Sequence, residues 1–110
     1  MEPRFVYITA MNAAQAEHLG RSLVEARLAA CANILEAATS IYWWQGEIHR
    51  EREAILVAKT RADLVEALVA EVKRLHTYEV PCVVALPILA GNPDYLAWLT
   101  AETRPPAGFA

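Results

Sequence analysis

The feature that most constrains the fold is the segment spanning residues 30–60, which is predicted to form one very long β-hairpin. Two runs rich in β-branched and aromatic residues flank a turn at Gln45-Gly46-Glu47, where Gly46 can adopt the positive φ that tight turns need. At about 3.3 Å per residue, each arm would span about 45–50 Å. A compact domain of this length is only about 35 Å across, so the hairpin is too long for its own domain to cover.

The outer half of this hairpin carries bulky apolar side chains at Ile41, Tyr42, Trp43 and Trp44. Such residues are unfavourable in water, and an isolated two-stranded ribbon is only marginally stable. Because neighbouring strand residues point to opposite faces, one tryptophan can pack in an interface while the other caps a pocket or faces water; simple packing of both is the alternative. A second copy of the same chain is the simplest cover for this end, so we expect a homo-oligomer.

The rest of the chain supplies the other elements of an α+β domain. Residues 5–10 and 82–86 are short apolar runs typical of buried strands, and each is separated from the hairpin by an amphipathic helical pattern. Asn12 is predicted to cap the first helix, Thr60 to open a capping box for the second, and Asn92 to cap a short C-terminal helix.

The resulting order is βαββαβ, which predicts a ferredoxin-like sandwich with the long hairpin between its second and third strands. Both main helices would cover one face of a four-stranded antiparallel sheet, and the uncovered face is a second argument for oligomerisation. Residues 1–103 are predicted to form this single domain, and residues 104–110 a flexible tail.

Composition narrows the function classes. The formal net charge is −3 with no basic cluster, which argues against a nucleic-acid partner. The N-terminal residues lack the pattern of a signal peptide, and no apolar run approaches the roughly 18 residues that span a bilayer, so we expect a cytoplasmic protein with no membrane partner. Cys31 and Cys82 form no CxxC pair and are expected to be buried free thiols.

Several motifs together resemble the CutA family, the divalent-cation tolerance proteins. The resemblance extends over residues 5–99, with the motifs in the family's order and spacing. They are ACANI (30–34), SIYWWQGE (40–47), AKT (58–60), HTYEVP (76–81), ALPI (85–88) and GNPDYLAWL (91–99).

The resemblance implies a ferredoxin-like homotrimer in which the long hairpins pack around a threefold axis, as in the nitrogen-regulatory signal-transduction trimers. It also implies a cytoplasmic location in bacteria, unusual heat resistance, and a link to copper and other divalent cations. It implies no defined reaction. The chain departs from the family pattern at Thr77, where proline is usual, at Cys82, where an acidic residue is usual, and at Glu47, where a basic residue is common.

Possible metal ligands are scattered along the chain, and no pair has the spacing of a preformed site. Any site would have to be assembled by folding or across subunits. Imidazole and thiolate suit copper, so Cu²⁺ or another divalent cation is the expected cofactor. His18 and His49 are expected on solvated faces. The ligands that we predict are His76, Glu79, Cys31 and Cys82.

The loop at residues 76–81 is the strongest candidate for a ligand site, because it places His76, Tyr78 and Glu79 within four residues. For His76, the alternative is a cation that satisfies the C-terminus of the preceding helix. The resemblance places this loop near the subunit boundary, close to Trp44 of a neighbour. Lys59 could pair with Glu79, either as a structural bridge or in an anion pocket. The predicted ligand-binding set is therefore Lys59, Trp44, Tyr78 and Glu79.

Three functions follow from these observations. The first is a non-enzymatic homotrimer that binds divalent metal, copper in particular, or a small ligand in clefts between subunits. The second is a trimeric scaffold or signalling partner for which metal binding is incidental. The third is an enzyme of unknown reaction that uses the loop from His76 to Glu79. Either Cys31 or Cys82 would act as a nucleophile with His76, or Tyr78 and Glu79 would act as acid and base. Because the sequence has no nucleophile elbow, phosphate loop or dinucleotide fingerprint, we predict no enzymatic activity.

Overall fold

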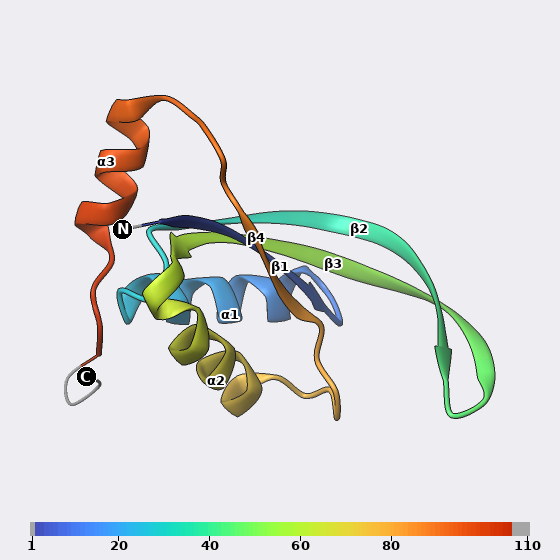
Figure 1. Cartoon of the computed structure of the whole chain (residues 1–110). Helices are drawn as coiled ribbons and strands as arrows, with labels where there is room; N and C mark the ends of the chain where they lie inside the picture. The colour runs from blue at the N-terminus through green and yellow to red at the C-terminus, as the bar shows by residue number, and fades with distance from the viewer. Residues whose placement is uncertain (1, 107–110) are drawn as a thin grey trace.

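A computed structural model describes residues 2–106 of the chain and confirms the α+β class and the predicted order of elements (Figure 1). The elements, in chain order, are β1 (Pro3–Ala10), α1 (Ala13–Glu25), β2 (Cys31–Trp44), β3 (Glu47–Arg61), the 3-10 helix η1 (Ala62–Leu64), α2 (Val65–Leu75), β4 (Val83–Pro87) and α3 (Pro93–Glu102). Within the predicted tail, residues 107–110 lie outside the described residues. The Arg104 N–H donates to the Arg27 carbonyl at 3.0 Å, which ties the start of that tail to the domain.

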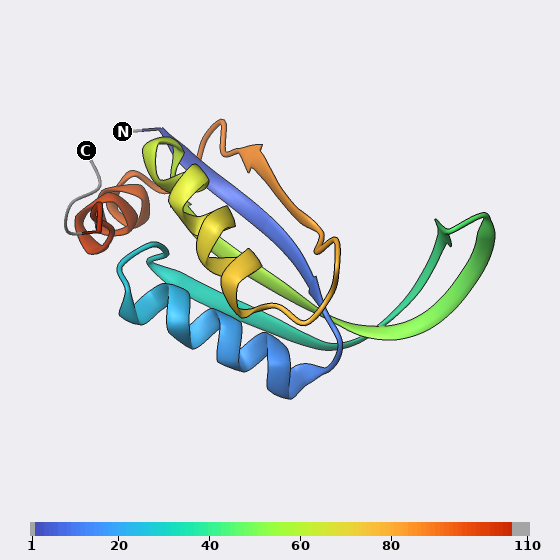
Figure 2. The same cartoon turned by 90° about the horizontal axis from the view of Figure 1, so that it is seen from below.

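The four strands form one sheet in the order β2-β3-β1-β4, and every neighbouring pair is antiparallel. Helices α1 and α2 cover one face of it (Figure 2). The core lies in this layer, where alternate strand residues meet the apolar stripes of the helices. Its fully buried members include Val6, Ile8, Leu56, Leu19, Leu23 and Leu68.

Helix α1 packs unusually close to the sheet at Gly20. A Cβ atom added there would lie 3.0 Å from Ala32 Cβ and 3.1 Å from Leu56 Cδ1. Glycine inside a helix costs about 1 kcal/mol relative to alanine. The close approach of α1 to β2 and β3 explains why position 20 is a glycine.

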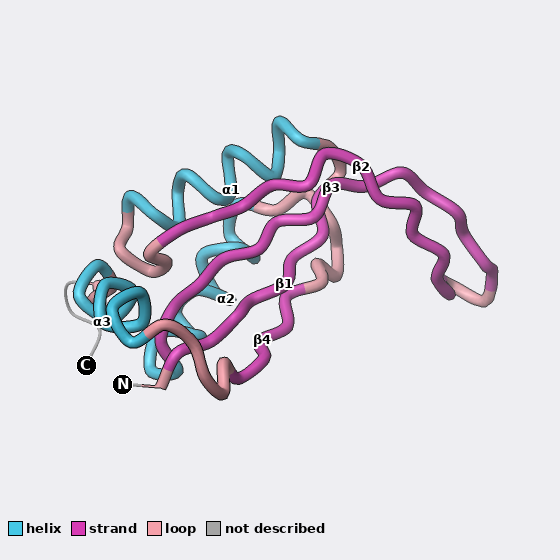
Figure 3. Tube along the Cα trace, turned by 90° about the horizontal axis from the view of Figure 1, so that it is seen from above, coloured by secondary structure: helices cyan, strands magenta, loops and turns pink. Residues whose placement is uncertain are grey.

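The hairpin closes through a two-residue loop, because Trp44 pairs with Glu47 across it. Gln45 and Gly46 have φ of 50° and 80°, which is the type I′ geometry that matches the twist of the strands. A register shift between Leu35 and Ala38 marks a bulge in β2. Beyond it the ribbon bends away from the sheet (Figures 2 and 3), as bulged ribbons do.

This bend corrects the predicted dimensions. The strands have 14 and 15 residues, as the long uninterrupted arms predicted. The whole described chain nevertheless extends only 43 Å along its longest axis, so the expectation of straight arms of 45–50 Å is wrong. The bulge and the twist of the two-stranded ribbon shorten its reach.

The predicted helix caps are confirmed at two of three places. Asn12 Oδ1 accepts from the Gln15 N–H at 2.9 Å, and Asn92 Oδ1 accepts from the Asp94 N–H at 3.0 Å. The capping box at Thr60 is wrong. Strand β3 continues through Arg61, no side chain caps α2, and the Arg61 guanidinium holds the Asp63 carboxylate at 2.9 and 3.1 Å.

The second face of the sheet remains largely open, and α3 is the one described helix that lies over an end of it (Figure 3). Leu35, Val84 and Leu86 on this face are each about half exposed, at 53%, 51% and 53%. On the outer hairpin, Ile41 and Trp43 are 69% and 71% exposed. The single chain therefore leaves a large apolar surface in water. None of the described helices is long and apolar enough to cross a membrane.

We expect Gly20→Ala to destabilise the fold. The gain of about 1 kcal/mol in helix propensity is opposed by overpacking against Ala32, which costs about 1–3 kcal/mol because a backbone-anchored Cβ cannot move aside. The net loss of about 1 kcal/mol is measurable by denaturant unfolding. His18→Ala on the exposed side of α1 is the control and should not lower stability. An unchanged or higher midpoint for Gly20→Ala would contradict the close packing described above.

Candidate functional site

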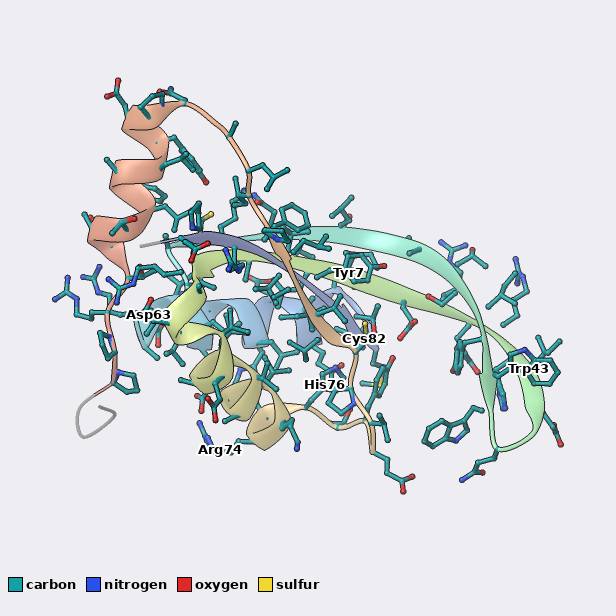
Figure 4. The ribbon with its side chains drawn as sticks, in the orientation of Figure 1. Tyr7, Trp43, Asp63, Arg74, His76 and Cys82 are labelled. Carbon is teal, nitrogen blue, oxygen red and sulfur yellow. The ribbon has the colours of Figure 1, made fainter. Side chains whose placement is uncertain are left out.

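A cleft of about 600 Å³ lies between the outer half of the hairpin and the loop that joins α2 to β4. Figure 4 shows Trp43 on the outer hairpin and Cys82 at the start of the segment leading into β4. The volume is in the range of small-molecule sites. The lining residues are Thr9, Ser40, Tyr42, Trp43, Trp44, Glu53, Tyr78, Glu79, Val80 and Cys82.

The polar centre of the cleft is a hydrogen bond between Tyr78 and Glu53. The Tyr78 hydroxyl donates to Glu53 Oε2 at 2.7 Å, and Glu53 is only 8% exposed. Loss of solvent, and then the bond to this carboxylate, raise the pKa of Tyr78 well above its usual range. A buried carboxylate without a cation is costly, and one phenol offsets only part of that cost. Glu53 therefore remains available to a positively charged ligand.

His76 lies behind the cleft and braces its loop. Its Nε2 is 2.8 Å from the Thr9 carbonyl oxygen, and its Nδ1 accepts from the Tyr78 N–H at 3.1 Å. A carbonyl only accepts, so Nε2 carries the hydrogen, and the ring has no free lone pair. The ring is also nearly buried, with its centroid 4.4 Å from that of Tyr78. Both ring nitrogens of His76 are thus used within the chain, an arrangement that does not support its predicted role as a metal ligand.

The remaining donors in the cleft do not form a metal site within one chain. Cys82 and Glu79 both line it, but among residues 2–106 no group of three or more His, Cys, Asp or Glu side chains could hold an ion. Burial, and then the charge of Glu53, raise the pKa of the Cys82 thiol, which opposes the thiolate form that a metal requires. A complete site would need donors from a second chain.

Lys59 and Cys31 belong to a different cluster, on β3 and β2 beside α3. The Lys59 amine donates to Asn33 Oδ1 at 3.2 Å and lies 3.9 Å from Cys31 Sγ. The Tyr95 hydroxyl is 3.3 Å from the same sulfur, and the amine lies 5.8 Å from the centre of its ring. The predicted pairing of Lys59 with Glu79 is therefore wrong within the chain. Cys31 and Cys82 are free thiols, as predicted, but each is half-buried and not fully buried.

The structure thus divides the predicted site residues. Trp44, Tyr78, Glu79 and Cys82 meet in the cleft, whereas Lys59 and Cys31 do not reach it. Sequence reasoning did not identify Glu53 as a site residue. A usable signal was its position in strand phase with Ile55 and Val57, which places it on the open face of the sheet.

We expect Tyr78→Phe to destabilise the protein by about 1–2 kcal/mol at neutral pH, since it removes a hydrogen bond to a charged acceptor. The pKa of Tyr78 is raised in the folded state. Its contribution to the free energy of unfolding is therefore complete below the unfolded tyrosine pKa of about 10 and is lost as pH rises above that value. Denaturant unfolding from pH 7 to 11 should therefore show the wild-type advantage shrinking above pH 10. In a Glu53→Gln background, Tyr78→Phe should lower the stability by less, because the acceptor of the hydrogen bond is then neutral. An equal cost in both backgrounds would contradict the bond.

Comparison with known proteins agrees with this fold. Residues 4–102 match the family model described as CutA1 divalent ion tolerance protein. The divalent-cation tolerance protein CutA of Thermus thermophilus is 47% identical over 98 residues, covering 89% of this chain and 95% of that protein. The chloroplastic Protein CutA 1 of rice is 44% identical over 99 residues, covering 90% of this chain and 56% of that protein.

The solved structures show the same relation. The crystal structure of CutA1 from Oryza sativa superposes with a TM-score of 0.92 at 42% identity, over 94% of this chain and 95% of that one. Among the curated relatives, the chain spans about half the length of those from rice, mouse and Arabidopsis, at 56%, 55% and 54%. The family model and the bacterial relative cover nearly all of the chain, so the chain belongs to the CutA1 divalent ion tolerance protein family.

Proposed function

We propose that this protein contributes to divalent-cation tolerance as a homotrimer, without catalysing a reaction, and that it binds a divalent metal or a small ligand where subunits meet. The observation that carries the proposal is the position of the cleft. It lies against Trp43 and Trp44 on the outer hairpin, the part of the molecule that most needs a second chain to cover it. A ligand bound there would lie at or near a subunit boundary.

The case for a trimer rests on exposed apolar area at two places in one chain. The open sheet face exposes Leu35, Val84 and Leu86, and the outer hairpin exposes Ile41 and Trp43. Burying apolar surface stabilises by about 25 cal/mol per Å², so covering both regions strongly favours association. Three copies arranged around the hairpins would cover both regions with one repeated contact.

Metal binding is proposed with copper as the first candidate, because the cleft holds a thiol and two carboxylates from Cys82, Glu53 and Glu79. These donors form no site within the described part of one chain. The proposal therefore places any metal between donors of two subunits, and it excludes His76, whose two nitrogens are already bonded.

A trimeric scaffold or signalling partner is the second candidate. The saturated hydrogen bonding of His76 favours it, because the most characteristic side chain of the loop supports the fold and not a ligand. An enzyme is the least supported candidate, since the raised pKa of Tyr78 opposes its use as a general base and the raised pKa of Cys82 opposes a nucleophilic thiolate. For location we propose the cytoplasm. The relatives' names differ on this point, being chloroplastic for the rice protein and periplasmic for the solved Archaeoglobus fulgidus structure.

We expect sedimentation equilibrium at micromolar concentration to give a mass of three chains, each of 12.2 kDa. Trp43→Glu should shift the protein toward smaller species, because a charge buried at an apolar contact costs several kcal/mol. Val24→Glu, at a partly exposed position on α1, is the control and should leave the mass unchanged. A folded monomer of the unmodified protein would contradict the proposal.

We expect calorimetric titration with Cu²⁺ to show stoichiometric binding that weakens at least tenfold in Cys82→Ser. Cys31→Ser removes a thiol outside the cleft and serves as the matched control, with unchanged binding. His76→Ala should lower the unfolding midpoint without changing copper affinity, since its ring only braces the loop. Weak binding that is indifferent to Cys82 would favour the scaffold instead.

A further inference from the structure

The walls of the cleft combine aromatic rings with negative charge. Tyr42, Trp43 and Trp44 line it from the hairpin, and Tyr78 lines it from the opposite loop. Its two ionisable acids are Glu53, nearly buried, and Glu79, exposed. None of the residues that line it is lysine, arginine or histidine. The cleft thus offers several π faces and carboxylates, and its lining provides no cation to balance them.

The Glu53 carboxylate places a negative charge close to three other side chains of the lining, Tyr42, Tyr78 and Cys82. The pKa of Tyr42, of Tyr78 and of Cys82 is raised in each case, first by loss of solvent and then by nearby carboxylates. Glu53 contributes to all three. Loss of solvent opposes a charge of either sign, but the Glu53 carboxylate, which acts on all three groups, favours a positive charge beside it.

Within one chain, the size and donor chemistry of the cleft favour an organic molecule over a bare metal ion, which would need further donors from a second subunit. A volume of about 600 Å³ is that of an organic molecule. A divalent ion needs several oxygen, nitrogen or sulfur donors at about 2.0–2.6 Å, and no such group exists among residues 2–106. Indole and phenol faces contribute nothing to coordination, but they bind the alkyl groups of a large cation well.

We propose that this cleft binds a small organic ammonium ion, with the aromatic side chains around its alkyl groups and the Glu53 carboxylate facing its charge. The inference rests on the proposed function in one respect, since it takes the cleft to be the ligand site of the protein. It deepens that function by naming the class of ligand. It also accounts for Glu53, because the ammonium ion supplies the counter-charge that the lining of the cleft lacks.

Choline is a suitable probe, and 3,3-dimethylbutan-1-ol is its neutral carbon isostere. Isothermal titration of the intact protein should give a choline affinity at least about tenfold higher than that of the isostere, because only the cation gains the cation–π and carboxylate interactions. Equal affinities, or no binding of choline at millimolar concentration, would overturn the proposal.

Two charge-matched variants test the role of Glu53. Glu53→Gln keeps an acceptor for the Tyr78 hydroxyl but removes the charge, and should weaken choline binding about tenfold. Glu66→Gln makes the same change at an exposed position in α2 and should leave the affinity unchanged. Circular dichroism verifies that both variants fold. Undiminished choline binding in folded Glu53→Gln would overturn the proposal.

A second pair of variants tests the aromatic wall. Tyr42 is 40% exposed, so its replacement leaves the core intact. Tyr42→Leu removes a π face and should weaken choline binding several-fold, whereas Tyr42→Phe keeps the ring and should bind as the native protein does. Equal affinities for the two variants would count against a cation held by rings.

The outcome is separable from that of the copper titration. Choline binding that depends on Glu53 and Tyr42 supports the inference whether or not Cu²⁺ binds. Copper binding that depends on Cys82, with no response to choline, overturns the inference and leaves the proposed metal role intact. Competition between the two would place both ligands in the one cleft and support both.

Discussion

The structure depends on the pairing of β2 with β3 along almost their whole length. This pairing is closed by a two-residue loop and interrupted once, by the bulge between Leu35 and Ala38. Before the bulge the two strands are part of the sheet and cover α1. Beyond it they form a free ribbon that bends away from the domain (Figure 2). The bulge therefore separates the part of the hairpin that makes the core from the part that presents rings to the outside.

The cleft is a consequence of the same bend. The loop after α2 is held in place by His76, whose ring connects the Thr9 carbonyl with the Tyr78 N–H. Tyr78 in turn reaches across to Glu53, just past the bulge. One side of the cleft thus belongs to the folded domain and the other to the ribbon. Any motion of the ribbon would change the cleft, and contacts that fix the ribbon in an assembly would also fix the site.

Two charged side chains, Lys59 and Glu53, differ in the partners that surround them. Lys59 projects from the sheet beside Asn33, Cys31 and Tyr95, which supply a hydrogen bond, a sulfur contact and an aromatic ring. Among residues 2–106, Glu53 is bonded to one phenol and forms no ion pair with a cation. The contacts of Lys59 are those of a stable surface side chain. Glu53 instead retains the free-energy cost of a buried, unpaired carboxylate, which a positively charged ligand can relieve. The difference distinguishes a structural cluster from a candidate binding site.

The sequence by itself determined the strands, the helices and the order in which they occur, because alternation, helical periodicity and caps such as Asn12 are local properties of the chain. It also indicated a surface too apolar for one copy, and it pointed to the loop at His76. Tertiary structure decided which side chains meet. It placed Glu53 with Tyr78, kept Lys59 away from Glu79, and bonded both nitrogens of His76. These outcomes depend on the register of β1 with β3 and on a one-residue bulge, and a shift of one residue reverses which face a strand residue occupies, so no local pattern could fix them.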